Sequence, residues 1–130
     1  MKALAFLAIG KVGIIDIPIP DPGPNDAVIK TTASLICTSD VHTVRGVIEI
    51  PEGRVLGHES VGIVYKAGAN VARCKEGDRV VVNAITPCGK CDPCQSGLAS
   101  QCGGMLGGYK FTTQRDGNMA EYFFVNDADY

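Results

Sequence analysis

The chain has 130 residues, a formal net charge of −2 and a hydrophobic fraction of 45%, which is typical of one globular domain and not of a disordered protein. Acidic and basic residues are interspersed, so the composition offers neither a basic patch for nucleic acid nor a charged face for a membrane. Every apolar run falls short of the roughly 18 residues that a membrane-spanning helix needs.

The first seven residues are apolar and briefly resemble a signal peptide. Gly10, Lys11 and Asp16 interrupt that pattern, and a secretory leader requires a longer apolar run. We therefore predict a cytoplasmic protein. The same residues, 1–7, predict a first strand, because they are apolar and contain no turn former.

Short strands separated by turn residues follow along the chain. After Asp26 the sequence is rich in β-branched residues, which favour strands, and Thr38 and Ser39 are expected to cap a short helix that ends at Val44. This pattern predicts a mainly β fold with short helices, arranged as a small antiparallel or mixed barrel that is partly open. The predicted strands cover residues 1–7, 12–18, 26–36, 59–68, 79–82 and 120–125.

The fingerprint of a dinucleotide-binding domain, G-x-G-x-x-G after a strand, is missing from these 130 residues. Gly103–Gly104 and Gly107–Gly108 have the wrong spacing and no preceding strand, so we interpret them as loop glycines. We expect residues 1–130 to lack a Rossmann domain and to form one domain of another kind.

Four of the six cysteines follow a regular spacing: Cys88, Cys91, Cys94 and Cys102 are separated by two, two and seven residues. Four thiolates in a tetrahedron are the ligand set of a closed, structural zinc site. They leave no position open for substrate, and their role is to fold a segment poor in apolar residues. We predict a zinc-binding cysteine lobe over about residues 87–108, called the cysteine lobe below.

Two other interpretations of these cysteines stay open. They could form a pair of disulfides, or they could hold an iron–sulfur cluster, whose ligand runs also use two-residue spacers. The ferredoxin run, however, closes with a three-residue spacer and a proline, whereas Gly103 follows the last cysteine here. Cys74 lies apart from the others and is expected to be a plain free thiol.

A second group of metal-binding residue types lies upstream. Cys37 ends a predicted strand and His58 opens another, and together they could supply two of the three protein ligands of a catalytic zinc. Asp40 could accept the second ring proton of His58, and Glu59 would add a carboxylate beside the metal. A hydroxyl and an imidazole for moving a proton come from Ser39 and His42.

Three motifs in this order resemble the medium-chain zinc-dependent alcohol dehydrogenases: C-x-S-D-x-H from Cys37, G-H-E from Gly57, and C-x2-C-x2-C-x7-C from Cys88. The likeness spans essentially the whole chain. The segments CTSDVHTV and GGMLGGYKF with DGNMAEYFFVNDAD are most similar to the bacterial secondary-alcohol branch, which is often NADP-linked.

The resemblance implies a GroES-like catalytic domain, a partly open β-barrel with a zinc lobe. It implies catalytic-zinc ligands at Cys37 and His58, a metal-approaching carboxylate at Glu59, and a proton relay that begins at Ser39 and continues toward His42. It also implies that Asp40 holds the histidine and that Cys88, Cys91, Cys94 and Cys102 bind the structural zinc. In that family the third catalytic-zinc ligand and the NAD(P)-binding domain come later in the chain, and Asp127 and Asp129 stand too early to be that ligand.

The expected function is therefore the zinc-assisted oxidation of a small, secondary alcohol, with hydride passing to NADP or NAD in an intact enzyme that is a homo-oligomer. Cofactor-binding residues stay unassigned. We expect the 130 residues alone to bind zinc and to be inactive. A non-catalytic, zinc-stabilised GroES-like module is the alternative, and it has no need for the set around Cys37 and His58.

Overall fold

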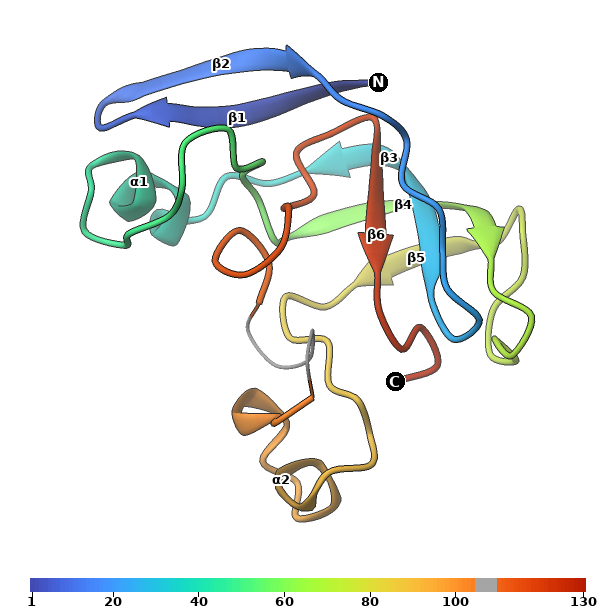
Figure 1. The fold of residues 1–130 in the computed structure, drawn as a ribbon. Coiled ribbons are helices and arrows are strands. Elements are labelled where there is room, and N and C mark those ends of the chain that lie inside the picture. Colours follow the sequence, from blue (N-terminus) through green and yellow to red (C-terminus); the bar gives the residue numbers. More distant parts are fainter. Residues whose placement is uncertain (105–109) are drawn as a thin grey trace.

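The structure is a computed structural model that describes residues 1–104 and 110–130. Six strands and three short helical elements make up the described regular structure. Figure 1 shows the strands gathered above and the cysteine lobe projecting below them. In chain order the elements are β1 (Lys2–Ala8), β2 (Lys11–Asp16), β3 (Ala27–Ser34), α1 (Thr38–Val44), β4 (Ser60–Ala67), β5 (Arg79–Val82), α2 (Asp92–Gln95), the 3₁₀ turn η1 (Ala99–Gln101) and β6 (Tyr122–Val125).

All strand pairs of the two sheets are antiparallel. One sheet is the hairpin β1–β2, and the other has the order β5–β4–β3–β6. Single bridges join the hairpin to neighbouring segments, at Ala3 with Ala120 and at Ala5 with Val55. The sheets are open and do not close on themselves, so the prediction of a mainly β, partly open barrel is confirmed.

The predicted strands all exist, but several boundaries were wrong. The strand predicted to reach Pro18 ends at Asp16, before a proline-rich stretch that lacks backbone donors. The strand predicted to reach Ile36 ends at Ser34, because the chain turns there into α1. The cap of α1 is Cys37, not Thr38 or Ser39. Within the cysteine lobe, predicted to lack regular structure, two short helical turns form.

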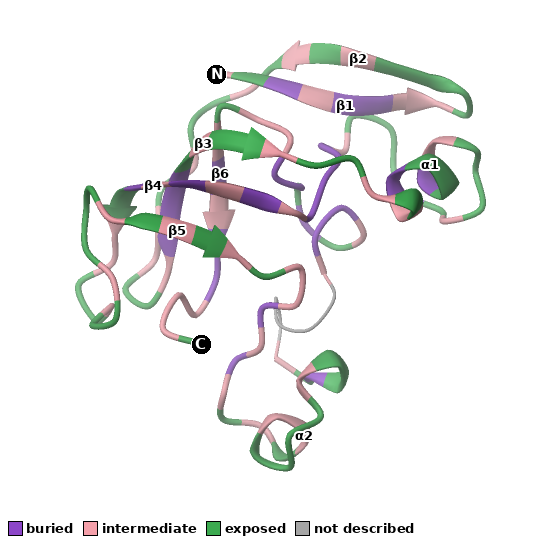
Figure 2. Ribbon diagram, turned by 180° about the vertical axis from the view of Figure 1, so that it is seen from behind, coloured by how far each residue is buried: buried purple, intermediate pink, exposed green. Residues whose placement is uncertain are grey.

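The main core lies between β3, β4 and β6. Ile29, Val64, Phe111 and Phe123 are nearly inaccessible and pack together, and the two phenyl rings meet edge to face with centroids 6.4 Å apart. A smaller cluster around Phe6 and Leu56 lies between the hairpin and α1. Figure 2 shows buried residues along the strands, whereas the lobe is mostly intermediate or exposed.

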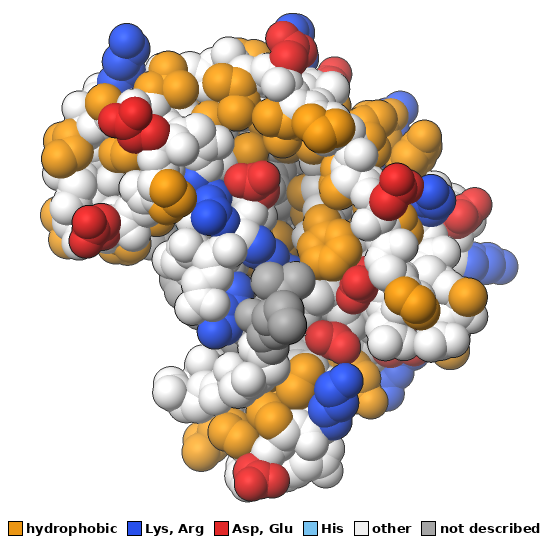
Figure 3. Space-filling model, viewed as in Figure 1, with side chains coloured by type: hydrophobic (Ala, Val, Ile, Leu, Met, Phe, Trp, Pro, Cys, Tyr) orange, Lys and Arg blue, Asp and Glu red, His pale blue; other side chains and the backbone are white. Residues whose placement is uncertain are grey.

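Residues 87–104, the described part of the cysteine lobe, contribute nothing to these two clusters. Between residues 87 and 104 the only buried residues are Cys88 and Cys102. Gly107 and Gly108, predicted to be loop glycines at the end of the lobe, lie outside the described residues. Figure 3 shows the lobe set off from the strands, and acidic and basic side chains lie side by side over this face.

Among residues 1–104 and 110–130, no helix has the length and apolar character that crossing a bilayer requires.

Candidate metal centres

The four spaced cysteines of the lobe converge on one point. Their sulfur atoms all lie within 4.8 Å of one another, and Cys91 Sγ is 3.9 Å from Cys102 Sγ. Four sulfurs placed about 2.3 Å from a zinc ion in a tetrahedron are about 3.8 Å apart, so the cluster fits zinc. All six cysteines of the chain are free thiols, and the disulfide interpretation is therefore wrong.

Local turns aim these sulfurs inward. Gly89 and Gly97 adopt φ values of 69° and 79°, which glycine reaches without steric cost. Cys91 caps α2, and Pro93 lies in the first turn of that helix, where a missing N–H leaves no bond unmade. The two-residue spacers thus become tight turns, as the spacing predicts.

Backbone N–H groups also point at the sulfurs. Cys102 Sγ accepts hydrogen bonds from Cys88 N and Gly104 N, each at 3.3 Å. The N–H groups of Cys94 and Gly103 lower the pKa of Cys91 to about 6, while desolvation and the neighbouring Cys91 raise the pKa of Cys94 to about 12. Four thiolates this close repel one another unless a cation lies between them, so the donor set requires a metal to ionise fully.

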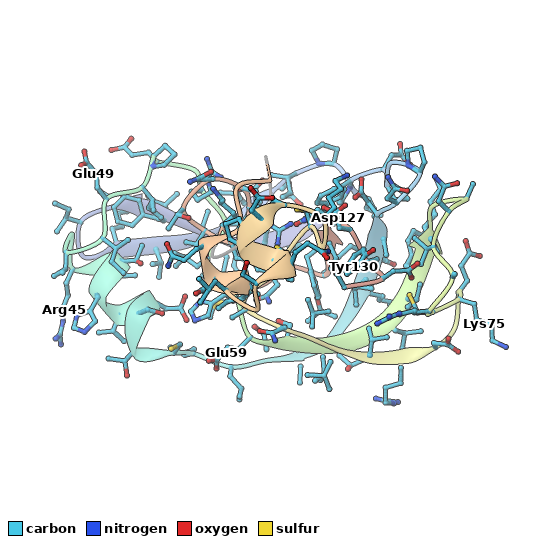
Figure 4. The ribbon with its side chains drawn as sticks, turned by 90° about the horizontal axis from the view of Figure 1, so that it is seen from below. Arg45, Glu49, Glu59, Lys75, Asp127 and Tyr130 are labelled. Atoms are coloured by element: carbon cyan, nitrogen blue, oxygen red, sulfur yellow. The ribbon has the colours of Figure 1, made fainter. Side chains whose placement is uncertain are left out.

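The second group forms at the end of the β3–β4 pair from which the chain leads into α1. Ser34 pairs with Ser60, and Cys37 and His58 lie just beyond this last pair. Cys37 Sγ, a ring nitrogen of His58 and a carboxylate oxygen of Glu59 lie within 4.8 Å of one another. Figure 4 shows the Glu59 side chain between α1 and the strands of the larger sheet.

Asp40 joins the two ends of this group. One of its oxygens, Oδ2, accepts the backbone N–H of Cys37 at 2.8 Å, and the other, Oδ1, lies 3.5 Å from His58 Nδ1. Both side chains are about 5% exposed. This contact raises the pKa of His58 to about 9. Burial raises the pKa of Asp40, but His58 and the Cys37 N–H outweigh it and hold that pKa below its ordinary value.

Ser39 and His42 take different places on α1. Ser39 Oγ lies 3.2 Å from His58 Nε2, the ring nitrogen on the side away from Asp40. His42 is exposed one helical turn further on, where residues three apart are neighbours on the helix surface. Ser39, with the His58 ring nitrogen, also lowers the pKa of Cys37. The predicted set around Cys37 is thus brought together, with His42 at its solvent side.

Sequence reasoning missed two residues that contact the backbone before His58. Thr112 Oγ1 and the Asn118 N–H both donate to Gly57 O, at 3.2 Å and 3.1 Å. They lie more than fifty residues downstream, in a segment that contains neither cysteine nor histidine. The one available signal was the run of polar residues between two predicted apolar strands, which is not specific.

Comparisons with known proteins find zinc-dependent and NADP-dependent alcohol dehydrogenases among the relatives of this chain. Residues 23–130 match the family model described as the alcohol dehydrogenase GroES-like domain. The NADP-dependent isopropanol dehydrogenase of Thermoanaerobacter brockii is 49% identical over 130 residues, which are 99% of this chain and 37% of that protein. A probable NADP-dependent isopropanol dehydrogenase of Mycoplasma pneumoniae is 52% identical with the same coverage.

Among solved structures, the apo form of a zinc-dependent alcohol dehydrogenase 2 from Streptococcus pneumonia superimposes with a TM-score of 0.91 at 35% identity. The match covers 99% of this chain and 36% of that one. An alcohol dehydrogenase from Thermus sp. ATN1 gives 0.89 at 32% identity, covering 99% and 38%. The chain thus spans little more than a third of the length of these relatives.

Proposed function

We propose that this chain, which belongs to the alcohol dehydrogenase GroES-like domain family, is the zinc-binding catalytic domain of an NAD(P)-dependent enzyme that oxidises small secondary alcohols. Relatives named as NADP-dependent isopropanol dehydrogenases support both the substrate class and NADP as the cofactor. In this proposal residues 1–130 form the catalytic domain, and the cysteine lobe within it holds a structural zinc.

The observation that carries the proposal is the convergence of Cys37, His58 and Glu59. Their donor atoms lie within 4.8 Å of one another, although Cys37 and His58 are about twenty residues apart in the sequence. A structural module needs only the four-cysteine cluster, which is closed to substrate. A second donor group with fewer protein ligands leaves room for a reacting molecule, as a catalytic metal site does.

The residues around this group have separate tasks. Asp40 holds Nδ1 of His58, so we assign the other ring nitrogen, Nε2, as the ligand atom. When bound there, zinc supplies a Lewis acid for an alcohol oxygen. Ser39 Oγ, beside Nε2, is placed to accept the proton of the substrate hydroxyl while it gives its own hydroxyl proton onward. His42, exposed one turn along α1, can pass that proton to solvent.

Metal analysis of the purified chain tests the proposal. We expect close to two zinc ions per chain, one held tightly by the cysteine lobe and a weaker one by Cys37 and His58. Cys37→Ser and His58→Ala should each remove only the weaker ion, whereas Cys91→Ser should affect the tight one. A purified chain that is coloured and contains iron would instead support the iron–sulfur interpretation.

Activity of the chain by itself is a separate test. We expect negligible oxidation of 2-propanol with NADP, because residues 1–130 carry no G-x-G-x-x-G fingerprint for the cofactor. Measurable turnover would contradict this expectation. A chain that holds one zinc, with Cys37→Ser unchanged in metal content, would instead support the non-catalytic zinc-stabilised module.

A further inference from the structure

The carbonyl oxygen of Gly57 receives two hydrogen bonds from one distant segment. Thr112 Oγ1 donates at 3.2 Å and the backbone N–H of Asn118 at 3.1 Å. This oxygen belongs to the peptide group that joins Gly57 to His58. Because a peptide group is planar, fixing its oxygen also fixes the plane from which the His58 backbone departs.

Thr112 adopts a costly conformation to make its contact. Its φ is 68°, although a β-branched residue at positive φ is a genuine outlier. The N–H of Thr113 donates to Phe111 O at 2.7 Å, which makes a γ-turn of the rare, strained form with Thr112 at its centre. The side chain is buried. Such strain persists only where the surroundings over-determine it, and it concentrates at functional sites.

The rest of the segment closes tightly against the residues that lead into His58. The N–H groups of Gly117 and Met119 donate to Val55 O and Leu56 O, both at 2.9 Å. Gly57 has a φ of 93°, and a Cβ added there would lie 2.5 Å from the Met119 side chain. The backbone before His58 is therefore clamped along its length by residues 112–119.

We propose that Thr112 is a positioning residue for His58: its hydroxyl holds the Gly57–His58 peptide plane, so that the imidazole meets Cys37 and Glu59. Asp40 holds the same histidine from the opposite side, through the ring. The His58 side chain is thus fixed at both its backbone and its Nδ1 end. This inference rests on the proposed function, because it assigns a role at the same metal site.

Three substitutions separate the hydroxyl from the backbone strain. Thr112→Val keeps the branched shape and loses the hydroxyl, Thr112→Ser keeps the hydroxyl, and Thr112→Gly relieves the strain but loses the hydroxyl. Chelator competition measures the dissociation constants of both zinc ions in the 130-residue chain. We expect Thr112→Val and Thr112→Gly to weaken binding of the second zinc about tenfold or more, as loss of a ligand-supporting contact does. Thr112→Ser should bind it as the wild type does.

Thr113→Val is the matched control, because the Thr113 hydroxyl donates to Lys110 O and not to Gly57. The control should leave the second zinc constant within about twofold, and all variants should leave the lobe zinc unchanged. A general loss of stability would raise both dissociation constants together and would overturn the positioning role. So would Thr112→Gly if it folds and binds the second zinc as tightly as the wild type.

A zinc-independent measurement distinguishes failure of this inference from failure of the proposed function. Hydrogen exchange of the Asn118 N–H, which shares the Gly57 oxygen with Thr112, should accelerate about tenfold or more in Thr112→Val and recover in Thr112→Ser. If the wild-type chain holds only the lobe zinc, the proposed function fails. If Asn118 exchange is unchanged in Thr112→Val, the inference fails whatever the zinc content.

Discussion

At the scale of single residues, Asp40 contacts both of the proposed zinc ligands that lie beyond the β3–β4 pair. Its two oxygens divide the work: one holds the backbone of Cys37 and the other faces the ring of His58. The carboxylate is almost fully buried, so neither contact is replaced by water if the charge is lost. A buried donor that loses its hydrogen-bond partner costs more free energy than the hydrogen bond itself contributes to stability.

Replacing Asp40 by Asn should therefore weaken the second zinc site selectively. The amide keeps the shape but removes the charge that faces His58, and we expect about tenfold weaker zinc binding at that site and about 1–3 kcal/mol less stability. Chelator competition and urea unfolding measure the two effects. Asp21→Asn, at an exposed carboxylate paired with Lys66, is the control, and an equal effect there would refute the assignment.

Two glycines with similar backbone angles should respond differently to alanine. Gly53 has a φ of 81° with open space around its Cβ position, whereas the Gly57 position is filled by Asn118 and Met119. Gly53→Ala meets backbone strain alone, about 1–2 kcal/mol, and Gly57→Ala adds overpacking of about 1–3 kcal/mol. Urea unfolding of both variants measures the difference. Equal losses in the free energy of unfolding would show that Asn118 and Met119 move aside at little cost.

Individual ligand residues could be predicted because their chemistry shows in the sequence. Cys37, Asp40 and His58 lie in short motifs, and the structure brings them together as the motifs indicate. That Cys37 and His58 bind zinc stays a prediction. Thr112 could not be found in this way, because a threonine hydroxyl has no characteristic spacing and its partner is 55 residues away.

At the scale of elements, Arg115 connects three segments that the sequence separates. Its guanidinium donates to the Asn126 side chain after β6 and to Thr86 Oγ1, at 2.6 Å, before the cysteine lobe. Its Cζ lies 3.7 Å from the centre of the Phe111 ring. Burial lowers the pKa of Arg115 to about 10, so the group stays charged at neutral pH and makes charge-assisted hydrogen bonds.

Replacing Arg115 by Met should loosen this junction. The apolar stem over Phe111 is largely kept, but Asn126 and Thr86 lose a charged donor, and we expect a loss of about 1–3 kcal/mol in the free energy of unfolding. Urea unfolding measures it. Arg79→Met, on the exposed side of β5, should change stability by less than about 0.5 kcal/mol. Comparable losses in the free energy of unfolding for both variants would mean that the contacts of Arg115 do not contribute measurably to stability.

Most elements were predictable because their pattern is local. Apolar or β-branched runs bounded by turn residues marked the strands, and the errors fell at the strand ends. The strand after Gly10 ends two residues early, before the prolines. The helical turn α2 was missed because its cap is Cys91, which is not a preferred capping residue. The order of strands in the sheet depends on long-range pairing, which no local pattern specifies.

At the scale of the whole molecule, the chain has a fold with two independent sources of stability. The strands share apolar cores, whereas the described part of the cysteine lobe buries only two of its cysteines. We therefore expect the lobe to depend on a bound metal ion for its fold, as small zinc modules do. Tyr130 lies against Gly89 of the lobe, and Figure 4 shows its side chain beside the lobe ribbon.

Removing zinc with a chelator should unfold the lobe and leave the strands intact. We expect new protease cleavage sites between residues 88 and 102, while hydrogen exchange in β3 and β4 keeps its protection. Cys37→Ser serves as the control, because it lacks the second site and isolates the effect of the lobe ion. Simultaneous loss of protection in the lobe and in β3 would show that the molecule unfolds as one unit.

The pairing of β3 with β4 links the metal site to the folding of the sheet. Ser34 faces Ser60, so continuing the ladder by two steps brings Ile36 opposite His58 and places Cys37 within reach of it. A slip of one residue would turn every following side chain to the opposite face and separate the two donors. A zinc ion bound by both Cys37 and His58 would therefore stabilise chains with the correct register of β3 and β4 relative to chains with a slipped register, and would do so during folding.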